Sequence, residues 1–258
     1  MIASIIQARV GSTRLPGKIL KPILGVSMLG RMIERVKRAK RPDVIIVATT
    51  EKPEDDVTVR LAKKCGVMVF RGSERDVLDR FYGAAKEVGA DMVVRLTGDC
   101  PLMDPAVIDL VIDSFQESRK IFDYCSTPSN YPEGLDVEIF TFSTLEEMAH
   151  EARLPSEREH VSLFIKNHSD RFTSKSLRDG DSDNSSMHWS VDTQADFDFV
   201  TKIFERLYPT NPFFDREDIL ALLTKHQEIL EINKGGTGYE GLAKSLREDE
   251  EAENKLKV

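Results

Sequence analysis

The chain has 258 residues, of which 40% are hydrophobic and 31% are charged, and its formal net charge is −8 at pH 7. A chain of this length and composition can bury a sizeable core. The acidic balance argues against broad binding to nucleic acid or to an anionic membrane, because either partner needs a basic face on the scale of a domain. A small anionic ligand in a local basic site stays compatible with this charge.

Nothing in the sequence predicts a membrane span or a secretory leader. No apolar run approaches the roughly 20 residues that cross a bilayer, and Met1 leads directly into a strand pattern. We therefore expect a cytoplasmic protein. The three cysteines, Cys65, Cys100 and Cys125, are odd in number and far apart, which predicts reduced thiols rather than a disulfide framework.

The first part of the chain alternates apolar strands with amphipathic helices. The strands are expected over residues 2–7, 44–49, 67–70 and 92–96, and the helices over 28–39, 55–65, 73–87 and 106–118. This alternation predicts an α/β fold with a largely parallel sheet and helices on both faces. Ligands of such sheets bind at the carboxyl ends of the strands.

After about residue 120 the pattern changes. Strands are expected over residues 122–125, 137–142, 172–177 and 187–191, and helices over 144–151, 156–167, 195–207 and 216–224. The longer polar connections, such as the loop expected over 179–186, indicate a mixed sheet. From Gly235 the sequence becomes glycine-rich and then charged. We expect a domain over 1–234 followed by a charged tail over 235–258 that is either a solvated, fraying helix or a solvated coil.

The loop over residues 7–18, which follows the first strand, concentrates positive charge in an acidic protein. The first acidic residue of the whole chain is Glu34. The cations and small residues of the loop are Arg9, Gly11, Ser12, Arg14, Gly17 and Lys18. Glycines allow close backbone approach, and the cations supply charge at separated points, so the loop predicts a polyphosphate site. It matches neither the Walker pattern nor G-x-G-x-x-G, and a solvated basic turn is the alternative.

Two aspartates follow predicted strands and are candidate metal ligands. Asp99 comes after a strand that ends at Thr97, and Asp192 comes after the apolar run 187–191. Mg²⁺ prefers oxygen ligands and commonly takes one or two carboxylates together with phosphate oxygens. The alternatives are that Asp99 forms a turn and that Asp192 or Thr193 caps the next helix.

Other polar residues are expected in structural or acceptor-binding positions. Asp104 precedes Pro105 and is expected to cap a helix. Ser73 is expected to cap the helix over 73–87 in a capping box with Asp76, and Trp189 is expected to pack in the core.

Two further segments are candidates for lining an acceptor pocket. Asp136 and Glu138 lie on one face of a predicted strand, because side chains alternate with a period of two. Arg158, Glu159 and His160 form a polar cluster in the first turn of a predicted helix. Both sets suit a hydroxylated acceptor, and Arg158 suits a carboxylated one. A solvated helix start is the alternative for the second set.

Taken together, these segments resemble the cytidylyltransferase family that includes spore coat polysaccharide biosynthesis protein F, a relative of the CMP-sialate (acylneuraminate) and CMP-KDO synthetases. The matching segments are residues 7–18, 70–81, 96–105, 131–138, 158–160 and 189–197. The resemblance implies a nucleotide-diphospho-sugar transferase (GT-A-like) fold, with three α/β/α layers and a mostly parallel mixed sheet. It also implies a CTP-dependent enzyme that uses Mg²⁺, activates a sugar or sugar acid as its CMP derivative and releases pyrophosphate in glycan biosynthesis.

The resemblance also assigns roles to single residues. The implied nucleotide contacts are Ala8, Arg9, Gly11, Ser12, Arg14, Lys18, Ser73 and Asp99. Arg9 and Lys18 would stabilise charge on the phosphates, and Asp99 and Asp192 would hold the metal. The chain departs from the family pattern at one position. The Gly-Lys-Pro that is common in the family is replaced here by Gly25-Val26-Ser27, so one cation of that pattern is absent. Related synthetases are dimers, which implies a homodimer.

Two rival functions stay open at this point. A glycosyltransferase on the same fold would use a nucleotide sugar and release a nucleoside diphosphate, although the arginine-rich loop favours a substrate with one more phosphate. A non-catalytic nucleotide-binding subunit is the other rival, and the presence of both Asp99 and Asp192 speaks against it. The sequence does not name the acceptor sugar, and it leaves the preferred base open.

Overall fold

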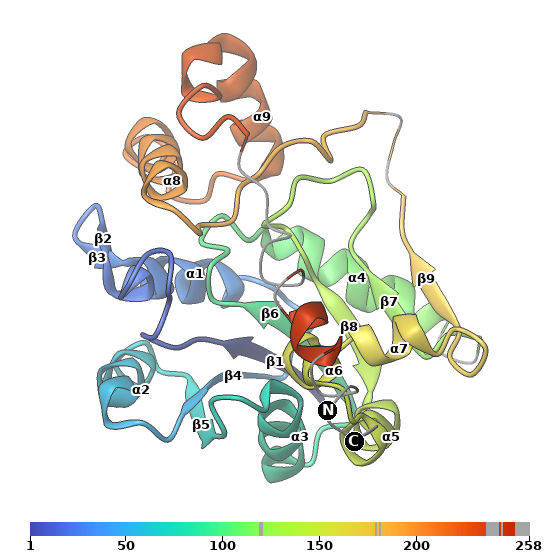
Figure 1. The fold of residues 1–258 in the computed structure, drawn as a ribbon. Coiled ribbons are helices and arrows are strands. Elements are labelled where there is room, and N and C mark those ends of the chain that lie inside the picture. The colour runs from blue at the N-terminus through green and yellow to red at the C-terminus, as the bar shows by residue number, and fades with distance from the viewer. Residues whose placement is uncertain (119–120, 179, 181, 236–242, 244, 251–258) are drawn as a thin grey trace.

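The computed structural model describes residues 1–118, 121–178, 180, 182–235, 243 and 245–250. Figure 1 shows a central sheet with helices on both sides. Within the described residues the strand order of the main sheet is β5-β4-β1-β6-β8-β7-β9. The parallel strands of its first part are β1 (Ile2–Gln7), β4 (Val44–Thr50), β5 (Met68–Gly72) and β6 (Met92–Thr97).

The second part of the sheet is shorter and mixed. It contains β7 (Tyr124–Ser126), β8 (Glu138–Thr141) and β9 (Ser174–Ser176). Strand β8 runs antiparallel to both β6 and β7, whereas β9 runs parallel to β7. A separate hairpin joins β2 (Pro22–Ile23) to β3 (Val26–Ser27). The mostly parallel mixed sheet that the sequence predicts is therefore confirmed.

The helices form the two outer layers. Their bounds are α1 (Met28–Val36), α2 (Asp56–Lys64), α3 (Val77–Val88), α4 (Pro105–Ser118), α5 (Phe142–Glu151), α6 (Pro155–His160), α7 (Leu163–Asn167), α8 (Gln194–Leu207) and α9 (Arg216–Lys225). Short 3-10 turns cover Lys18–Leu20, Pro53–Asp55 and Gln227–Ile229.

Each face of the sheet has its own apolar core, because successive side chains of a strand point to opposite faces. Ile2 and Ile6 of β1 pack in a cluster with residues of α1, α4, α8 and α9. Ala3 and Ile5 of the same strand pack with residues of α3, α5 and α7. The result is a three-layer α/β/α arrangement in which β1 and β6 are covered on both sides.

Helix α3 begins later than the sequence predicts. The expected start is Ser73, but the helix starts at Val77, and Asp76 is its N-cap, accepting a hydrogen bond from the Asp79 backbone N–H at 2.9 Å. The Ser73 hydroxyl instead accepts from the backbone N–H of Asp76 at 3.1 Å. The capping box expected from Ser73 is therefore wrong, because the aspartate expected as its partner is the cap itself. The expected cap at Asp104 is confirmed, since its carboxylate accepts from the Ala106 N–H at 2.8 Å.

The helix expected over 156–167 is broken at Val161. This residue has φ 45° and is fully buried, and it separates α6 from α7. The break turns the Ser162 hydroxyl toward the carboxylate of Glu138, to which it donates at 2.7 Å. Tertiary burial overrides the local helical pattern here, so the prediction of a single long helix is wrong.

The strand expected over 187–191 is also absent from the described structure. His188 forms one isolated bridge with Glu133 and the segment does not continue as a strand. Its apolar pattern comes from burial alone, and Trp189 is fully buried. The packing role expected for Trp189 is confirmed.

Part of the C-terminal segment packs on the domain. Residues 245–250 are helical, and Ser245 and Asp249 are buried. The Asp249 carboxylate accepts from the Ser156 backbone N–H at 2.9 Å, at the start of α6. A helix in this segment was one of the two expected forms, but Ser245 and Asp249 are buried rather than solvated, since the Asp249 side chain satisfies a helix N-terminus. Most of the range 236–258 lies outside the described residues, and the domain boundary at 234 stays a prediction.

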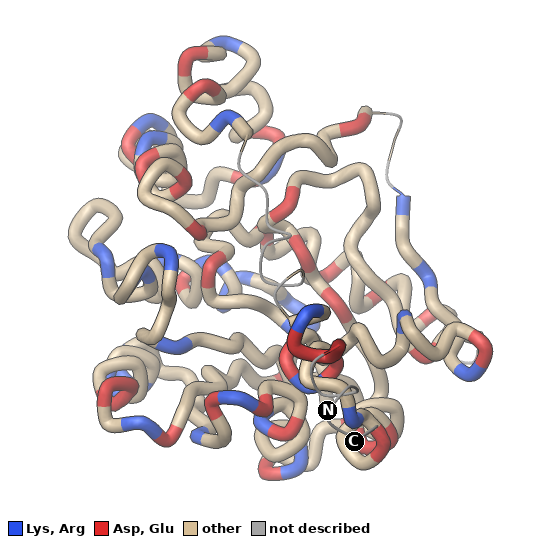
Figure 2. The backbone as a smooth tube through the Cα atoms, viewed as in Figure 1, with Lys and Arg blue, Asp and Glu red and all other residues tan. Residues whose placement is uncertain are grey.

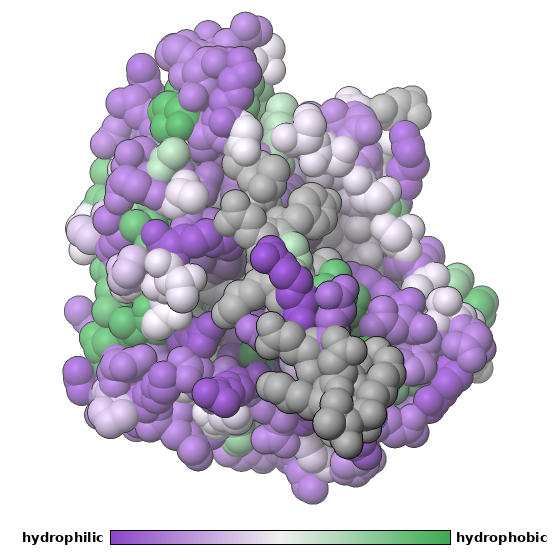
Figure 3. Space-filling model, in the orientation of Figure 1, coloured by the Kyte–Doolittle hydropathy of each residue, from purple (hydrophilic) through white to green (hydrophobic). Residues whose placement is uncertain are grey.

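The surface carries charge of both signs. Figure 2 shows acidic and basic residues interspersed along the helices and loops, and the face seen in Figure 3 is largely hydrophilic with separate small apolar areas. In the described part of the chain, no helix combines the length and the apolar character that a membrane span requires.

Candidate active site

Three segments that are distant in the sequence meet beyond the carboxyl end of β6. The backbone N–H of Val191 donates to the carbonyl of Asp99 at 2.8 Å, and that of Trp189 donates to Glu133 at 2.7 Å. The N–H of Glu133 in turn donates to the Met187 carbonyl at 3.0 Å. These backbone contacts fix the segment 187–192 against both the end of β6 and the loop before β8.

Gly134 allows this close approach. Its φ is 100°, a region that favours glycine. A Cβ at this position would lie 2.6 Å from the backbone nitrogen of Ser190 and 2.6 Å from the carbonyl carbon of Trp189. No side chain fits there without moving the backbone of the segment that carries Asp192.

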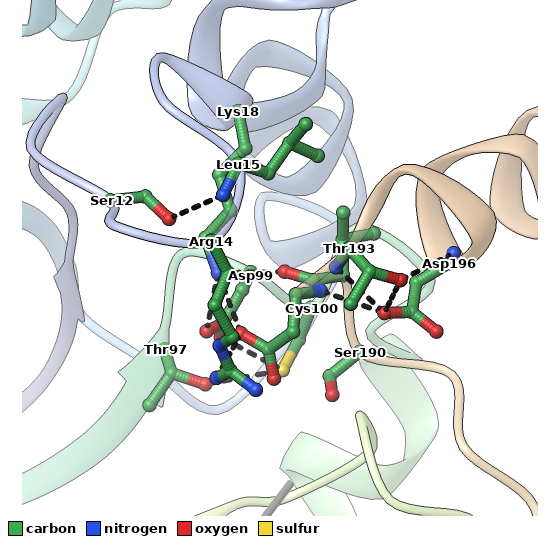
Figure 4. Close-up of polar contacts among 12 residues, drawn as sticks. Ser12, Arg14, Leu15, Lys18, Thr97, Asp99, Cys100, Ser190, Thr193 and Asp196 are labelled. Atoms are coloured by element: carbon green, nitrogen blue, oxygen red, sulfur yellow. Dashed lines mark hydrogen bonds and ion pairs between the residues drawn. The ribbon is translucent and has the colours of Figure 1, made fainter. Parts of the chain in front are cut away.

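The first loop folds back on itself and directs Arg14 and Lys18 into the site, while Arg9 pairs with Glu74 at 3.0 Å. The N–H of Val10 donates to the Asp55 carboxylate at 2.7 Å, and the N–H of Gly17 donates to the Val10 carbonyl at 3.1 Å. Gly17 has φ 69° and leads into the short helical turn that starts at Lys18. In Figure 4, Arg14 extends from this loop toward the residues that follow β6, including Asp99.

The Lys18 ammonium lies between the two predicted metal ligands. Its Nζ is 3.2 Å from Oδ2 of Asp99, 3.0 Å from Oδ1 of Asp192 and 2.6 Å from the carbonyl of Val191. Burial opposes the charge on Lys18, but the Asp99 and Asp192 carboxylates outweigh it and raise the pKa of the ammonium. Burial likewise opposes the charge on Asp99, yet Lys18 and Thr97 lower the pKa of this carboxyl. Lys18 and Asp99 are therefore both ionised at neutral pH.

The sequence could not establish that Asp99 and Asp192 meet, and the structure brings both within reach of one cation. A guanidinium nitrogen of Arg14 also lies 2.8 Å from Oδ1 of Asp192. The position of the Lys18 ammonium shows that a cation can lie between the Asp99 and Asp192 carboxylates. Their oxygens are therefore a donor set that fits Mg²⁺. No group of three or more metal-binding side chains occurs among the described residues, so a bound ion would also need oxygens from phosphate or water.

Asp192 is held in place by the residues around Asp196. Thr193, rather than Asp192, caps α8 in a capping box with Asp196. The Asp196 carboxylate also accepts from the Asp192 backbone N–H at 3.1 Å. Although burial opposes the charge on His188, hydrogen bonds to Asp196 and Glu133 raise the pKa of its imidazole to about 10. A charged histidine thus supports the loop while the Asp192 side chain stays available to the site.

A continuous cleft of about 1090 Å³ runs from the first loop to α6. The predicted site residues that line it are Ala8, Arg9, Gly11, Ser12, Arg14, Lys18, Asp99, Asp136, Glu138, Glu159, His160 and Asp192. Ser73 and Arg158 are not among its lining residues. The cleft therefore joins the predicted nucleotide and acceptor residues in one space.

The cytidylyltransferase family model matches residues 3–199, most of the chain. The chain belongs to the cytidylyltransferase family. It is 30% identical over 233 residues to spore coat polysaccharide biosynthesis protein SpsF of Bacillus subtilis, covering 88% of this chain and 95% of the relative. The family resemblance expected from the sequence and the enzyme class, a nucleotidyltransferase, are confirmed.

Solved structures support the same fold for this cytidylyltransferase. A cytidylyltransferase from Leptospira borgpetersenii serovar Hardjo-bovis superposes with a TM-score of 0.85 at 36% identity, covering 92% of this chain and 98% of the other. A CMP:2-keto-3-deoxy-manno-octonic acid synthetase complexed with CTP gives a TM-score of 0.61 at 17% identity, covering 80% and 98%. At that identity the second likeness concerns the fold alone.

Glu138 occupies the floor of the cleft and is fully engaged by protein groups. It pairs with Arg95 at 2.5 Å and accepts from the Tyr124 hydroxyl at 2.5 Å. Burial opposes its charge, but Arg95, Lys166 and these hydrogen bonds lower the pKa of Glu138 to about 2. In this cytidylyltransferase Glu138 therefore joins β8 to β6 and β7.

Asp136 is the more open of the two acids. Its carboxylate accepts from the Gly134 backbone N–H at 2.8 Å, and no ion pair to it occurs among the described residues. The surrounding walls of the cleft desolvate the carboxylate and raise the pKa of Asp136 to about 6, although the side chain itself is exposed to the solvent in the cleft. Because this exposure screens the charge, the carboxylate stays ionised at neutral pH.

The cluster expected at the start of α6 divides into two parts. Arg158 donates to Asp76 at 2.5 and 2.9 Å and to the Ala149 carbonyl at 2.6 Å, so it ties α6 to α3 and α5. Arg158 does not line the cleft in this structure, and its expected contact with an acceptor stays a prediction. Glu159 stays at the cleft, where it accepts from the Ser245 hydroxyl at 2.7 Å, and that hydroxyl also lies 3.1 Å from Nε2 of His160.

Gln7, Arg80 and Arg95 are among the residues of the cleft that sequence reasoning missed. Gln7 and Arg80 lie inside the segments that carry the family resemblance, which was the available signal. Arg80 explains the place of Ser73, whose carbonyl accepts from its guanidinium at 2.6 Å. Ser73 thus lies outside the cleft and binds the guanidinium of Arg80, which lines it.

Proposed function

We propose that this cytidylyltransferase transfers CMP from CTP to a sugar or sugar acid in the biosynthesis of a surface polysaccharide or related glycan. The observation that carries the proposal is the Lys18 ammonium between Asp99 and Asp192, in a cleft that Arg9 and Arg14 also line. This arrangement offers cations for phosphate oxygens and two carboxylates for a metal in one place. The names of SpsF and of the CTP-bound synthetase, which concern those proteins, agree with it.

In the proposed reaction an acceptor oxygen attacks the α-phosphorus of CTP in line. The new O–P bond forms as the bond to the leaving oxygen breaks, pyrophosphate leaves, and the acceptor proton passes to water. Lys18, Arg14 and Arg9 donate hydrogen bonds to the phosphate oxygens and stabilise their developing charge. Such transfer depends on positioning and charge neutralisation and needs no protein nucleophile.

Asp99 and Asp192 would hold the Mg²⁺, which when bound polarises phosphate oxygens as a Lewis acid. Without substrate, Lys18 and Arg14 neutralise these two carboxylates. On nucleotide binding the two cations exchange their carboxylate contacts for phosphate oxygens. Each cation therefore faces a negative group both with and without nucleotide, which limits the cost of burying its charge.

At the other end of the cleft, Asp136, Glu159 and His160 are the proposed acceptor contacts, because each lines the cleft. Glu138 lines it too, with its oxygens already bonded to protein groups, so we assign it to shaping the floor. The homodimer and the cytoplasmic location stay predictions from the family resemblance and the sequence.

One experiment separates this function from its rivals. The protein is incubated with Mg²⁺, each of the four nucleoside triphosphates and a pool of sugars and sugar acids, and the released products are identified. Pyrophosphate release with CTP is the expected result. A nucleoside diphosphate released from nucleotide sugars would instead establish glycosyl transfer, and nucleotide binding without either product would indicate a non-catalytic subunit.

A further inference from the structure

His188 lies between two carboxylates that come from different parts of the chain. Its side chain is only 6% exposed. Its Nδ1 donates at 2.8 Å to Oε2 of Glu133, in the loop before β8, and its Nε2 lies 3.7 Å from Oδ1 of Asp196, in the first turn of α8. Glu133 lines the cleft. One buried imidazole therefore joins a carboxylate of the cleft to the helix that follows Asp192.

The neighbours of His188 hold it from several elements. The Asn233 amide donates to the His188 carbonyl at 2.7 Å and to Oδ1 of Asp196 at 3.2 Å. The Glu133 backbone pairs with the segment 187–189, and the Ser190 hydroxyl lies 3.3 Å from Nε2 of the ring. The imidazole is therefore fixed relative to the loop before β8, to α8 and to the segment around Asn233.

Asp196 connects His188 to Asp192. Its second oxygen, Oδ2, accepts from the backbone N–H of Asp192 at 3.1 Å and from that of Thr193 at 2.8 Å. Figure 4 shows the Asp196 side chain directed toward Thr193 at the start of the helix. Asp196 is only 1% exposed, and within the described residues its ion pair is with His188 alone. Removing the charge of His188 would leave this buried carboxylate uncompensated, which is strongly unfavourable.

The effect of that loss would fall on the backbone of Asp192. A buried carboxylate without a counter-charge takes up a proton or turns toward water. A protonated Asp196 is a weaker acceptor, and one that turns away no longer accepts from the Asp192 N–H. Asp192 would then lose the contact that fixes its backbone, while its own carboxylate stays chemically intact.

The capping box of α9 shows that a helix cap alone does not need a histidine. There Asp218 takes the place of Asp196 and accepts from the Asp215 N–H at 3.1 Å. Asp218 is half-buried, and in the part of the chain that the structure describes it forms no ion pair. A neutral donor, the Asn211 amide, contacts it at 3.0 Å. The buried imidazole is therefore an addition at the box that adjoins Asp192.

We propose that His188 is a positioning residue for the metal ligand Asp192, and that Glu133 anchors it from the cleft. This inference rests on the proposed function, which assigns Asp192 to Mg²⁺. His188 does not touch the reacting groups in this arrangement and acts through Asp196. Substitution of a group that orients a metal ligand typically lowers metal affinity by about 10- to 100-fold.

The test measures CTP binding by calorimetry over a series of Mg²⁺ concentrations and again in EDTA. It needs no acceptor, so the identity of the sugar is not required. His188→Gln keeps hydrogen-bonding groups at this position and removes the charge. Glu133→Gln is the second variant, at a side chain that is 36% exposed. Thermal unfolding of each variant reports whether it folds.

The same chain offers a matched pair of controls. Nδ1 of His226 lies 3.0 Å from Oε1 of Glu228, so this pair repeats the contact between His188 and Glu133. Neither residue lines the cleft. His226→Gln and Glu228→Gln should leave CTP binding unchanged with Mg²⁺ and in EDTA. Asp192→Asn tests the metal assignment itself and should raise the Mg²⁺ requirement further than the other variants.

His188→Gln should raise the Mg²⁺ concentration for half-maximal CTP binding by about 10-fold or more. Glu133→Gln should raise it by a smaller factor, because the new amide oxygen still accepts from Nδ1. In EDTA, His188→Gln should bind CTP with the wild-type affinity, since the cations that bind phosphate belong to the first loop. A purely structural role would instead change both affinities together or lower the melting temperature alone.

An unchanged Mg²⁺ requirement in folded His188→Gln would overturn the inference and leave the proposed function standing. If His188→Gln does not fold, the same result for Glu133→Gln overturns it. Equal weakening of CTP binding with Mg²⁺ and in EDTA would overturn it too, because the histidine would then support the site as a whole. An unchanged requirement in Asp192→Asn, or no CTP binding by the wild type, would overturn the proposed function and this inference with it.

Discussion

The two parts of the sheet position their functional residues in different ways. In the first part, β1 and β6 are each six residues long and pair in parallel along their whole length. In the second part, β7 and β9 have three residues each and β8 has four. Long backbone ladders fix the loops of the first part, whereas side-chain contacts such as those of Glu138 hold the second.

Because of this difference, we expect substitutions in the first part to alter catalysis and substitutions in the second part to alter stability. Lys18 and Asp99 follow well-formed strands, so changing either side chain removes a functional group without removing what holds the backbone. Glu138 links β8 to β6 and β7 in addition to their short backbone ladders, and Gly134 allows the segment around Trp189 to pack closely. Substitutions in the two parts should therefore affect different measurements, and four predictions test this from the largest expected effect to the smallest.

Glu138→Gln should destabilise the protein by about 3–5 kcal/mol, because it leaves the Arg95 guanidinium buried without a counter-charge. Urea unfolding at pH 7 measures the effect, and Glu117→Gln, at an exposed position, is the control. The pKa of Glu138 is lowered to about 2, so its contribution is present above about pH 4.5 and is lost as the pH falls toward 2. Equal midpoints for the two variants would show that the ion pair does not hold the second part.

Asp99→Asn should lower turnover by roughly 10²- to 10³-fold, since it removes a charged group from the site of transfer. Melting temperature should stay near the wild-type value, because the ladder of β6 is unchanged. Pyrophosphate release measures turnover, and Asp170→Asn, at an exposed position away from the cleft, is the control. Near-normal release from Asp99→Asn with excess Mg²⁺ would remove Asp99 from the metal site.

Gly134→Ala should cost about 1–3 kcal/mol through overlap with the backbone of Trp189 and Ser190. It should also lower turnover, because that backbone carries Asp192. Gly89→Ala is a matched control, since Gly89 also has a positive φ, of 64°, but an added Cβ there would meet nothing within 4 Å. Similar stability losses in both variants would assign the effect to backbone strain alone.

Thr193→Ala should cost about 1 kcal/mol, the usual value of a helix N-cap. Asp215→Ala removes the same type of capping box from α9 and should cost about as much. Only Thr193→Ala should also raise the Mg²⁺ concentration needed for half-maximal activity, because Thr193 adjoins Asp192. Titrations of both variants that coincide would show that the cap does not position this aspartate.

The sequence predicted the first part of the sheet more closely than the second for a physical reason. Strand β1 was expected at its observed bounds because its burial depends on its own apolar run. The meeting of Asp99 and Asp192 does not follow from the sequence, since it depends on a backbone hydrogen bond between residues far apart in the chain. The contacts of Arg158 are hidden in the sequence for the same reason, because its partner, Asp76, is the N-cap of another helix.

Gln7, Arg80 and Arg95 are a second example of a property that the sequence does not reveal. Their types and positions are visible in the sequence, but their unpaired atoms are a property of burial in three dimensions. Composition and spacing give the number and order of charges and do not reveal which donors already have partners. The order of the cations in the first loop is therefore visible in the sequence, while the partners of these buried groups require the three-dimensional structure.

The contacts of Ser245 and Asp249 have a practical consequence for handling this protein. A chain shortened to end at residue 234 would lose the carboxylate that accepts from the Ser156 N–H and the hydroxyl that Glu159 and His160 share. We expect such a chain to keep its affinity for the nucleotide, while its Michaelis constant for the acceptor rises. Assays that search for the natural sugar are therefore best run on a chain that retains residues 245–250, with any affinity tag at the N-terminus checked against the Met1 contact to Asp91.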